Sequence, residues 1–443
     1  MHRAVPQDFV LRKRIVHWDE VEVAIQIQIP GRQECLPAGL LPFACEEGGS
    51  KLRQMGAEPA DADARRWADT WLHHPTSSLL MSFSSISRQT LIKDTCYLNL
   101  RTSVPKAGNL HLAWEYAKNP AHHDMFIQML CVSPVVFMVI LKLIKDHPIF
   151  MNNSNVPQTP VNYQLAVTLY CMGRFGNTAC LADIAREAGI SEGSVEIFTN
   201  CCFTAIESLH DMFIQPLTPE EKEKEKRWMD EHVGFKGLWR EGCIMYNGTI
   251  IGNVPSNLQI LDYSHGLTGS AHDATAFEHT AAGKHPEWLF QGREFAWVDS
   301  AYSLTSQTIP VHKRPAAFHR ENAIFDCLVS HLRVCSEHCM GALKGRFQCL
   351  CGLHVSINSR EEHIEAGQWI TVSIILHNLI IDVEGKVSGA HFMGDHTQAE
   401  EDEDVEPHLE EENDVAPEEA GEQKQLQLTA ELLAFRQAAG IPF

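Results

Sequence analysis

The sequence predicts an α/β protein whose α/β part is preceded by an all-α domain, and three observations support this prediction. Between Gly242 and Val383, short apolar runs alternate with longer helical patterns, an order typical of α/β domains. From about residue 109 to residue 215, apolar residues recur at three- and four-residue spacing, which predicts helices. The chain has 443 residues, of which 44% are hydrophobic, so it can form substantial cores.

Changes in composition divide the chain into five segments. The first has mixed polarity without a sustained period, and we assign it no function. The predicted segments are an uncharacterised region over 1–107, a helical domain over 108–216, a connector helix over 217–241, the α/β core over 242–385, and an acidic disordered tail with a short terminal helix over 386–443.

Two short stretches define the connector and the end of the tail. Thr218–Glu221 has the form of a capping box with Pro219 at the first helical position, so a helix is expected to begin there. The mixed-charge run from there to Glu231 predicts a helix that solvent surrounds. Leu426–Ala438 is amphipathic and predicts the short terminal helix.

The formal net charge of −21 is concentrated in the tail, because thirteen acidic residues and neither Lys nor Arg lie between Glu400 and Glu422. Without that segment the chain would carry about −8, so its charge neither supports nor excludes a nucleic-acid partner. The fourteen cysteines are scattered through apolar stretches and the chain opens without an apolar signal. We therefore expect a reducing compartment.

The most apolar stretch, Met125–Ile144, is interrupted by Gln128, Pro134 and Lys142. The uninterrupted run is too short to cross a bilayer. Ser133 followed by Pro134 is typical of a helix N-cap and first helical position. The sequence thus predicts a buried helix and no contact with a membrane.

A helix-turn-helix pattern lies within the α domain. Leu181–Ala188 is followed by Gly189, which permits a sharp turn, and by Ser191, which can cap a second helix over Glu192–Phe198. Such a helix could enter a DNA major groove with Ser191 and Ser194 near its start. The neighbouring Glu192 and Glu196 are poor groups for approaching phosphate. An ordinary αα-corner in a helical bundle remains the alternative.

Three segments carry groups suited to phosphodiester chemistry. Gly242–Ile250 is an apolar strand with Asn247 at its polar end, and Phe295–Tyr302 is a buried strand that ends at Asp299. His331–Phe347 is helical and places Glu337, Met340, Gly341 and Lys344 along one side. Two-metal nucleases hold Mg²⁺ ions about 3.5–4 Å apart with carboxylates from separate elements. Strand ends and a facing helix can supply that arrangement.

The wording and order of four phrases give a resemblance to a known family. Gln164 to Gly385 resembles the Harbinger-type DDE transposases and transposon-derived nucleases, the DDE superfamily endonucleases. The matching phrases are Gly269–Asp273 (family form G-S-x-x-D), Trp297–Tyr302 (G-D-S-x-Y), Glu337–Phe347 (E-x-x-x-x-x-L-K-x-R-F) and Leu376–Leu379 (L-H-N-L). The resemblance implies an RNase H-like core that follows a helix-turn-helix domain.

The resemblance also implies roles for particular residues. Asp299 and Glu337 would be the second and third metal-binding carboxylates for Mg²⁺ or Mn²⁺, and Asp273 a supporting acidic residue. Arg333, Lys344 and Arg346 would lie near DNA phosphate, with a solvated basic face as the alternative. The implied partners are DNA and a separate DNA-binding protein. The implied location is the nucleus, and without the resemblance it would be the cytoplasm.

The sequence departs from the family at two places. The family's first carboxylate is the Asp of a D-G-T phrase, whereas this chain has Asn247–Gly248–Thr249; a neutral amide cannot replace that charge. The short connection from Ile250 to Leu258 also predicts that one core strand is missing. Two functions are therefore open: a Mg²⁺-dependent DNA endonuclease, or a non-catalytic DNA-binding or scaffold protein derived from a transposase. We expect no cleavage.

Overall fold

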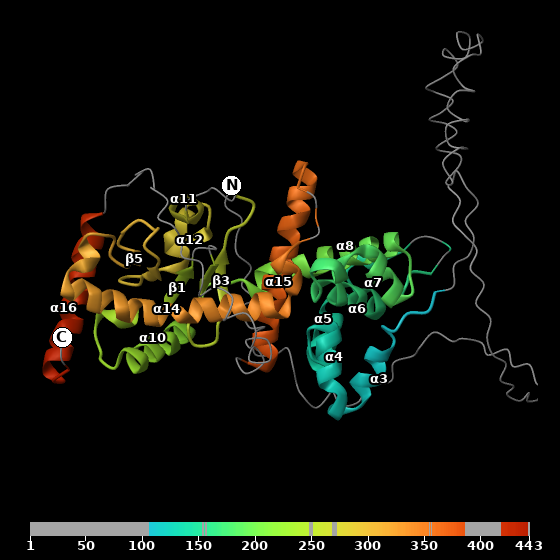
Figure 1. The fold of residues 1–443 in the computed structure, drawn as a ribbon, viewed down its shortest axis with the longest axis horizontal. Helices are drawn as coiled ribbons and strands as arrows, with labels where there is room; N and C mark the ends of the chain where they lie inside the picture. The colour runs from blue at the N-terminus through green and yellow to red at the C-terminus, as the bar shows by residue number, and fades with distance from the viewer. Residues whose placement is uncertain are drawn as a thin grey trace, which may run out of the picture. The chain divides into compact units, whose positions relative to one another are not determined.

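The computed structural model describes residues 106–152, 155, 157–247, 251–267, 273–353, 355, 357–385 and 418–441. The expectations for residues 1–105, and for disorder of the acidic segment up to residue 417, lie outside these residues. Within the described part, the α/β class is confirmed, because one five-stranded mixed sheet is surrounded by helices (Figure 1).

Helices alone form the described part of the chain before the sheet. They are α3 (Leu112–Lys118), η3 (Pro120–His122), α4 (His123–Leu130), α5 (Pro134–Ile144), η4 (Pro148–Phe150), α6 (Val161–Met172), η5 (Gly176–Ala179), α7 (Leu181–Ala188), α8 (Glu192–Glu207), α9 (His210–Phe213), α10 (Pro219–Val233) and η6 (Leu238–Glu241). Ser133 Oγ accepts from Val136 N–H and caps α5. Cys131 ends α4 in the left-handed conformation. The apolar stretch is thus two helices bent by 58°, not one.

Five strands form a single sheet in the order β3-β2-β1-β4-β5. They are β1 (Ile244–Asn247), β2 (Ile251–Asn253), β3 (Ile260–Tyr263), β4 (Ala296–Val298) and β5 (Thr308–Pro310). The first three pair antiparallel, while β1, β4 and β5 run parallel. The carboxyl ends of β1, β4 and β5 therefore meet at the same edge of the sheet.

The predicted loss of a core strand is wrong. The expected single strand Gly242–Ile250 ends at Asn247, and β2 returns antiparallel beside it with Asn247 opposite Ile251. Gly252 lies opposite Tyr246, and a Cβ at Gly252 would come within 2.5 Å of the Tyr246 ring. Glycine thus gives the ring room over β2. A strand of three buried residues has no alternation that sequence reasoning could detect.

The remaining helices are α11 (Asp273–Phe277), α12 (Ala281–Lys284), α13 (Pro286–Leu289), η7 (Ala316–Phe318), α14 (Arg320–Arg346), η8 (Gln348–Cys351), α15 (Arg360–Glu384) and α16 (Glu419–Ala438). Of these, α14 crosses the sheet (Figure 1). Its Phe325 packs on Trp297 of β4 at 6.0 Å between ring centroids. Further along, Ser336 Oγ donates to Asn253 Oδ1 of β2 at 2.8 Å. Because α14 packs on β1, β2 and β4, these contacts determine which of its side chains lie near the end of each of these strands.

Two neighbouring polar residues of α15 hold the edge strand β3. The buried Asn378 accepts from Ile260 N–H and donates to Ile260 C=O, as an adjacent strand would. Its amide also donates to Phe213 C=O of α9. His377 Nε2 lies 3.0 Å from Leu258 C=O, and burial lowers the pKa of His377 to about 4. The phrase Leu376–Leu379 thus joins the sheet to the helical part.

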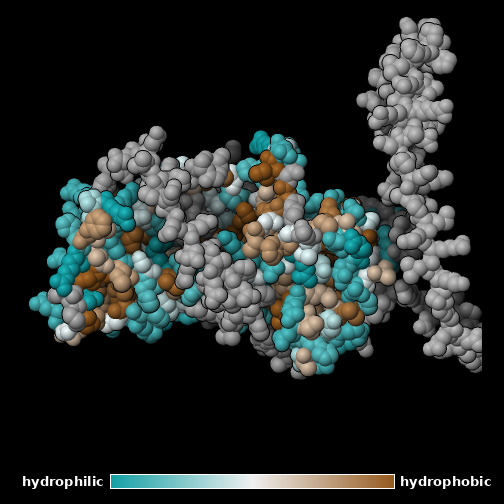
Figure 2. Space-filling view, in the orientation of Figure 1, coloured by the Kyte–Doolittle hydropathy of each residue, from teal (hydrophilic) through white to brown (hydrophobic). Residues whose placement is uncertain are grey.

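Among the described helices, α15 is long and apolar enough to cross a membrane by length and composition, and the bent pair α4 and α5 passes the same test together. Of the most apolar window of α15, 56% is buried inside the protein, as expected for a core helix. Over the face drawn in Figure 2, hydrophilic and hydrophobic residues are interspersed.

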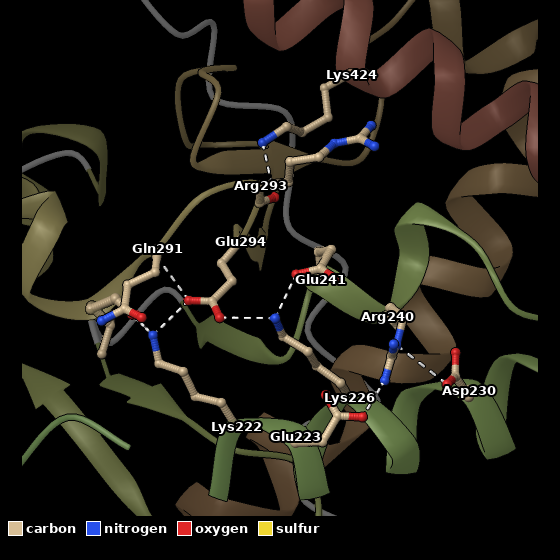
Figure 3. Close-up of polar contacts among 11 residues, drawn as sticks. Lys222, Glu223, Lys226, Asp230, Arg240, Glu241, Gln291, Arg293, Glu294 and Lys424 are labelled. Carbon is tan, nitrogen blue, oxygen red and sulfur yellow. Dashed lines mark hydrogen bonds and ion pairs between the residues drawn. The ribbon is translucent and has the colours of Figure 1, made fainter. Parts of the chain in front are cut away.

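The connector helix α10 is not surrounded by solvent as predicted, because one side of it carries a buried charge network (Figure 3). Lys222 Nζ contacts Glu294 Oε2 at 2.6 Å, and Lys226 Nζ bridges Glu294 and Glu241 at 2.9 and 2.6 Å. Burial alone would raise the pKa of Glu294, but the hydrogen bonds from both lysines outweigh it and lower that pKa. The network ties α10 to the loop before β4.

The terminal helix is also part of the core, and it begins at Glu419 rather than at the predicted Leu426. Leu428 and Leu432 are buried. Trp239 Nε1 donates to Leu428 C=O at 2.8 Å, and Gln425 Nε2 donates to Pro310 C=O at 2.9 Å. This helix therefore covers the edge strand β5, which would otherwise present unpaired backbone groups. The predicted terminal helix is present, but residues 418–424, which the sequence assigns to the disordered tail, belong to this folded part.

Candidate active site

Asp299 is the first residue after β4, at the edge where the parallel strands end. Its Oδ1 accepts from Ala301 N–H at 3.0 Å and lies 3.4 Å from Ser300 Oγ. Its Oδ2 lies 3.5 Å from Nη2 of Arg333 on α14. The carboxylate side chain is 34% exposed. It is thus fixed by its own turn and paired with a guanidinium, but solvent can still reach it.

Asn247 lies beside Asp299 by strand register. Met245 of β1 is opposite Trp297 of β4 in the parallel pair, and both residues in question lie two positions further along. Neighbouring strands are about 4.8 Å apart, so the backbones of Asn247 and Asp299 are adjacent at the sheet edge. The strand register thus puts the backbone of Asn247, the position predicted to have lost its carboxylate, next to that of Asp299.

Arg333 and Glu337 lie one helical turn apart on α14, so they share a side of that helix. Glu337 is exposed, whereas Arg333 is only 15% exposed in its side chain. The Nε of Arg333 is buried without a hydrogen-bond partner. The guanidinium therefore contacts Asp299 through Nη2 alone and not in a bidentate way. In this structure Arg333 is the counterion of Asp299, and its predicted DNA contact remains a proposal.

The other predicted DNA-contacting residues differ in their accessibility. Arg346 is buried, and its Nη1 donates to Cys131 C=O at 2.8 Å. The prediction that Arg346 contacts DNA is therefore wrong; its guanidinium instead satisfies a carbonyl at the end of α4. Lys344 is partly exposed on the same helix. Solvent therefore reaches the Lys344 side chain, and its contact with DNA phosphate stays a prediction.

Ser191 and Ser194 serve the start of α8. Ser191 Oγ accepts from Ser194 N–H at 3.2 Å, and the two hydroxyl oxygens are 2.6 Å apart. Gly189 precedes them in the left-handed conformation, with a φ of 68°, which favours glycine. The predicted cap is present. Glu192 and Glu196 are exposed in the first turns of α8.

Two acidic residues complete the picture of the core. Asp273 begins α11, but its side chain is outside the described atoms. Asp262, which the sequence reasoning missed, is buried and accepts from Tyr246 Oη at 2.7 Å and from the N–H groups of Ala281 and Ala282. It joins β3 to β1 and to the start of α12, so we assign it a structural role. An Asp inside an otherwise apolar strand was the available signal.

The residues at this edge do not fit a two-metal site. The position next to Asp299 carries an amide, and Arg333 already supplies a positive charge to the one carboxylate at the strand end. Across the described residues, no three His, Cys, Asp or Glu side chains gather where they could hold a metal ion. Asp299, already paired with a guanidinium, and one exposed carboxylate on α14 give too little negative charge for a pair of divalent ions.

Comparison with known proteins gives one match. Residues 247–378 match the family model of the DDE superfamily endonucleases. The matched part is under a third of the chain, and it runs from Asn247 through Asp299 and Glu337 to Asn378. This part of the chain is similar to transposase-like DDE nucleases, a family that acts on DNA and generally uses divalent metals. Comparisons with curated proteins and with solved structures gave no match.

Proposed function

We propose that the chain is a transposase-derived protein of the Harbinger type that binds DNA and has lost the cleavage step of the DDE endonucleases. The pairing of Arg333 with Asp299, next to a strand end whose residue is Asn247 and not Asp, carries this proposal. The site keeps the architecture of a nuclease edge. Its charges, however, are too few for a pair of divalent metal ions, because Arg333 already neutralises Asp299.

The sheet supports the descent. Three antiparallel strands followed by two parallel strands on the other side of β1 form the arrangement expected of an RNase H-like core. Asp299 follows β4, and Glu337 lies on the helix that crosses the sheet. Harbinger ancestry rests on the wording of the four phrases within this framework. The missing-strand objection no longer counts against it.

The loss of cleavage follows from charge. Hydrolysis of a phosphodiester by the two-metal route requires carboxylates that hold both ions and position water and the leaving oxygen. Substituting Asn for a carboxylate removes one negative charge and leaves an N–H₂ donor at the same position. The Arg333 guanidinium stabilises Asp299 without any metal. Both changes lower the affinity for divalent ions in the same direction.

DNA binding is proposed to use two surfaces. One is the pair α7 and α8, where Ser191 and Ser194 stand at the exposed start of the second helix. The other is the side of α14 that carries Arg333 and Lys344. The exposed Glu192 and Glu196 would limit the affinity of the first surface for DNA. The proposal therefore includes a separate DNA-binding partner protein. It also includes a nuclear location, where the DNA would be.

The test uses the purified full chain, supercoiled plasmid and short duplexes, with Mg²⁺ or Mn²⁺. The wild type should shift duplex DNA in a gel and leave every substrate uncut. The control is Asp299→Ala, which should also leave every substrate uncut. Cleavage by the wild type that disappears in Asp299→Ala would falsify the loss of catalysis. Failure to bind any DNA would sink the proposal as a whole.

A metal-dependent DNA endonuclease is the second candidate, favoured by the intact five-stranded sheet with Asp299 at the end of β4. It differs from the first candidate in its response to Asn247→Asp. If the wild type is inactive only for lack of charge, Asn247→Asp combined with Arg333→Ala should bring back metal-dependent cleavage. If the wild type already cuts, Asn247→Asp should raise its rate and Arg333→Ala alone should not abolish it.

A further inference from the structure

A basic segment follows β5. Residues 312–320 contain Lys313, Arg314 and Arg320, together with two histidines and no acidic residue, in a chain whose formal net charge is −21. Lys313, Arg314, His319 and Arg320 are exposed. Three permanent positive charges and no negative charge within nine residues make this segment a local basic cluster.

An aromatic ring stands in the middle of this charge. Phe318 is 73% exposed, and the guanidinium carbon of Arg314 lies 5.7 Å from its ring centroid. An exposed phenyl ring gains nothing from burial in this protein. A flat aromatic face beside a guanidinium is instead the combination on which nucleic-acid bases stack, while the guanidinium contacts the backbone.

Hydrogen bonds to α14 hold the inner side of residues 312–320, so the orientation of the outer side is fixed. The backbone N–H and Nδ1 of His312 both meet Asp326 Oδ1, at 2.9 and 2.8 Å. Asn322 Nδ2 donates to Ala316 C=O at 3.0 Å. These contacts anchor the inner side of the segment to α14, and they leave Arg314 and Phe318 facing outward.

The position of the segment relates it to the candidate active site. Val298 of β4 pairs with Pro310 of β5, so the segment starts beside Asp299 and ends at Arg320, where α14 begins. Arg320 and Arg333 are thirteen residues apart on α14, about 20 Å at 1.5 Å per residue.

We propose that residues 312–320 form a contact site for the DNA that flanks the candidate active site. Arg314 and the neighbouring cations contact phosphates, and Phe318 stacks on an unpaired base. This inference rests on the proposed function, because it assumes that the chain binds DNA. It adds a preference for DNA whose flank is single-stranded.

The test measures fluorescence anisotropy of the full chain with a blunt duplex and with the same duplex carrying a single-stranded extension. The extension should tighten binding by the wild type. Phe318→Ala should weaken binding of the extended probe by about fivefold or more relative to the blunt duplex. Phe318→Trp should keep the gain. Arg314→Ala should weaken binding to both probes and reduce the slope of log K against log salt by about 1.

Matched controls separate stacking from general loss of apolar or positive surface. Met151 is also 73% exposed, so Met151→Ala should bind both probes as the wild type does. Lys118 is an exposed lysine on α3, far in sequence from residues 312–320. Lys118→Ala should leave the slope of log K against log salt unchanged. Melting curves check that every variant is folded.

Two results would overturn the inference alone. One is duplex binding by the wild type together with a Phe318→Ala variant that binds both probes equally well as the wild type. The other is tighter binding of an RNA extension than of a DNA extension, which would assign the segment to RNA. If the wild type binds neither DNA probe, both the inference and the proposed function are wrong.

Discussion

Arg333 Nη2 lies 3.5 Å from Asp299 Oδ2, and this one pair links the end of β4 to the helix that crosses the sheet. The DDE endonucleases, which residues 247–378 resemble, generally use divalent metals. In this chain, a side chain of the protein supplies the positive charge. The pair is partly exposed, so its Coulomb energy is small. Its main consequence concerns which ligands the edge can accept.

The first prediction concerns metal binding. Millimolar Mn²⁺ should not raise the melting temperature of the wild type, whereas Asn247→Asp combined with Arg333→Ala should gain stability. A concentration ten times the dissociation constant would add about 1.4 kcal/mol. Differential scanning fluorimetry checks this, and Asp299→Asn in the double variant should remove the gain. A wild-type shift that depends on Asp299 would contradict our assignment of Arg333.

The second prediction concerns Asn378. Asn378→Ala removes three hydrogen bonds and leaves the N–H and C=O of Ile260 buried without their partner. We expect a loss of about 2–4 kcal/mol in the free energy of unfolding. Asn200→Ala, at an exposed position of α8, should cost under about 0.5 kcal/mol. Urea denaturation measures both, and equal midpoints would refute the edge-strand role.

The third prediction concerns the charge network of α10. Lys222→Met leaves Glu294 buried with only Lys226 to pair it, and we expect a loss of about 2–4 kcal/mol. Adding Glu294→Leu should restore part of that stability, because no buried charge is then left uncompensated. For comparison, Arg186→Ala breaks the exposed Arg186–Asp183 pair and should change stability by under about 1 kcal/mol. Additive effects in the double variant would argue against coupling.

The fourth prediction tests whether α16 belongs to the core. Leu432 is 4% exposed and Leu426 is 71% exposed on the same helix. Leu432→Ala should cost about 2–4 kcal/mol of unfolding free energy, through lost burial and the cavity it leaves. Leu426→Ala should cost almost nothing. If both substitutions were silent in denaturant unfolding, the helix would not be part of the folded core.

The fifth prediction follows from the pKa of His377, which burial lowers from an ordinary 6.5 to about 4. Above pH 6.5 the side chain is neutral in both the folded and the unfolded chain. Between pH 6.5 and pH 4 only the unfolded chain takes up the proton. The free energy of unfolding should therefore fall by about 1.4 kcal/mol for each pH unit by which the pH is lowered in this range. Below pH 4 this contribution levels off. The difference between wild type and His377→Gln across this range isolates it, and parallel pH profiles would contradict the assignment.

Local patterns decided much of this protein. The α/β class, the caps at Ser133 and Ser191, and the helix start at Thr218 were all readable from the sequence, because caps and turns depend on a few adjacent residues. The place of Asp299 at a strand end followed from the apolar run before it. The family match from Asn247 to Asn378 agrees with the phrases that suggested the resemblance.

Tertiary structure decided the rest. Contacts between residues far apart in the chain bury Arg346 against Cys131 and bury the charged side of α10. Such contacts also pack α16 on β5 and place β2 within the sheet. Sequence periodicity cannot report such contacts. The identity of Asn247 was plain in the sequence, but the partner of Asp299 was not, because only the crossing of α14 over the sheet brings Arg333 to it.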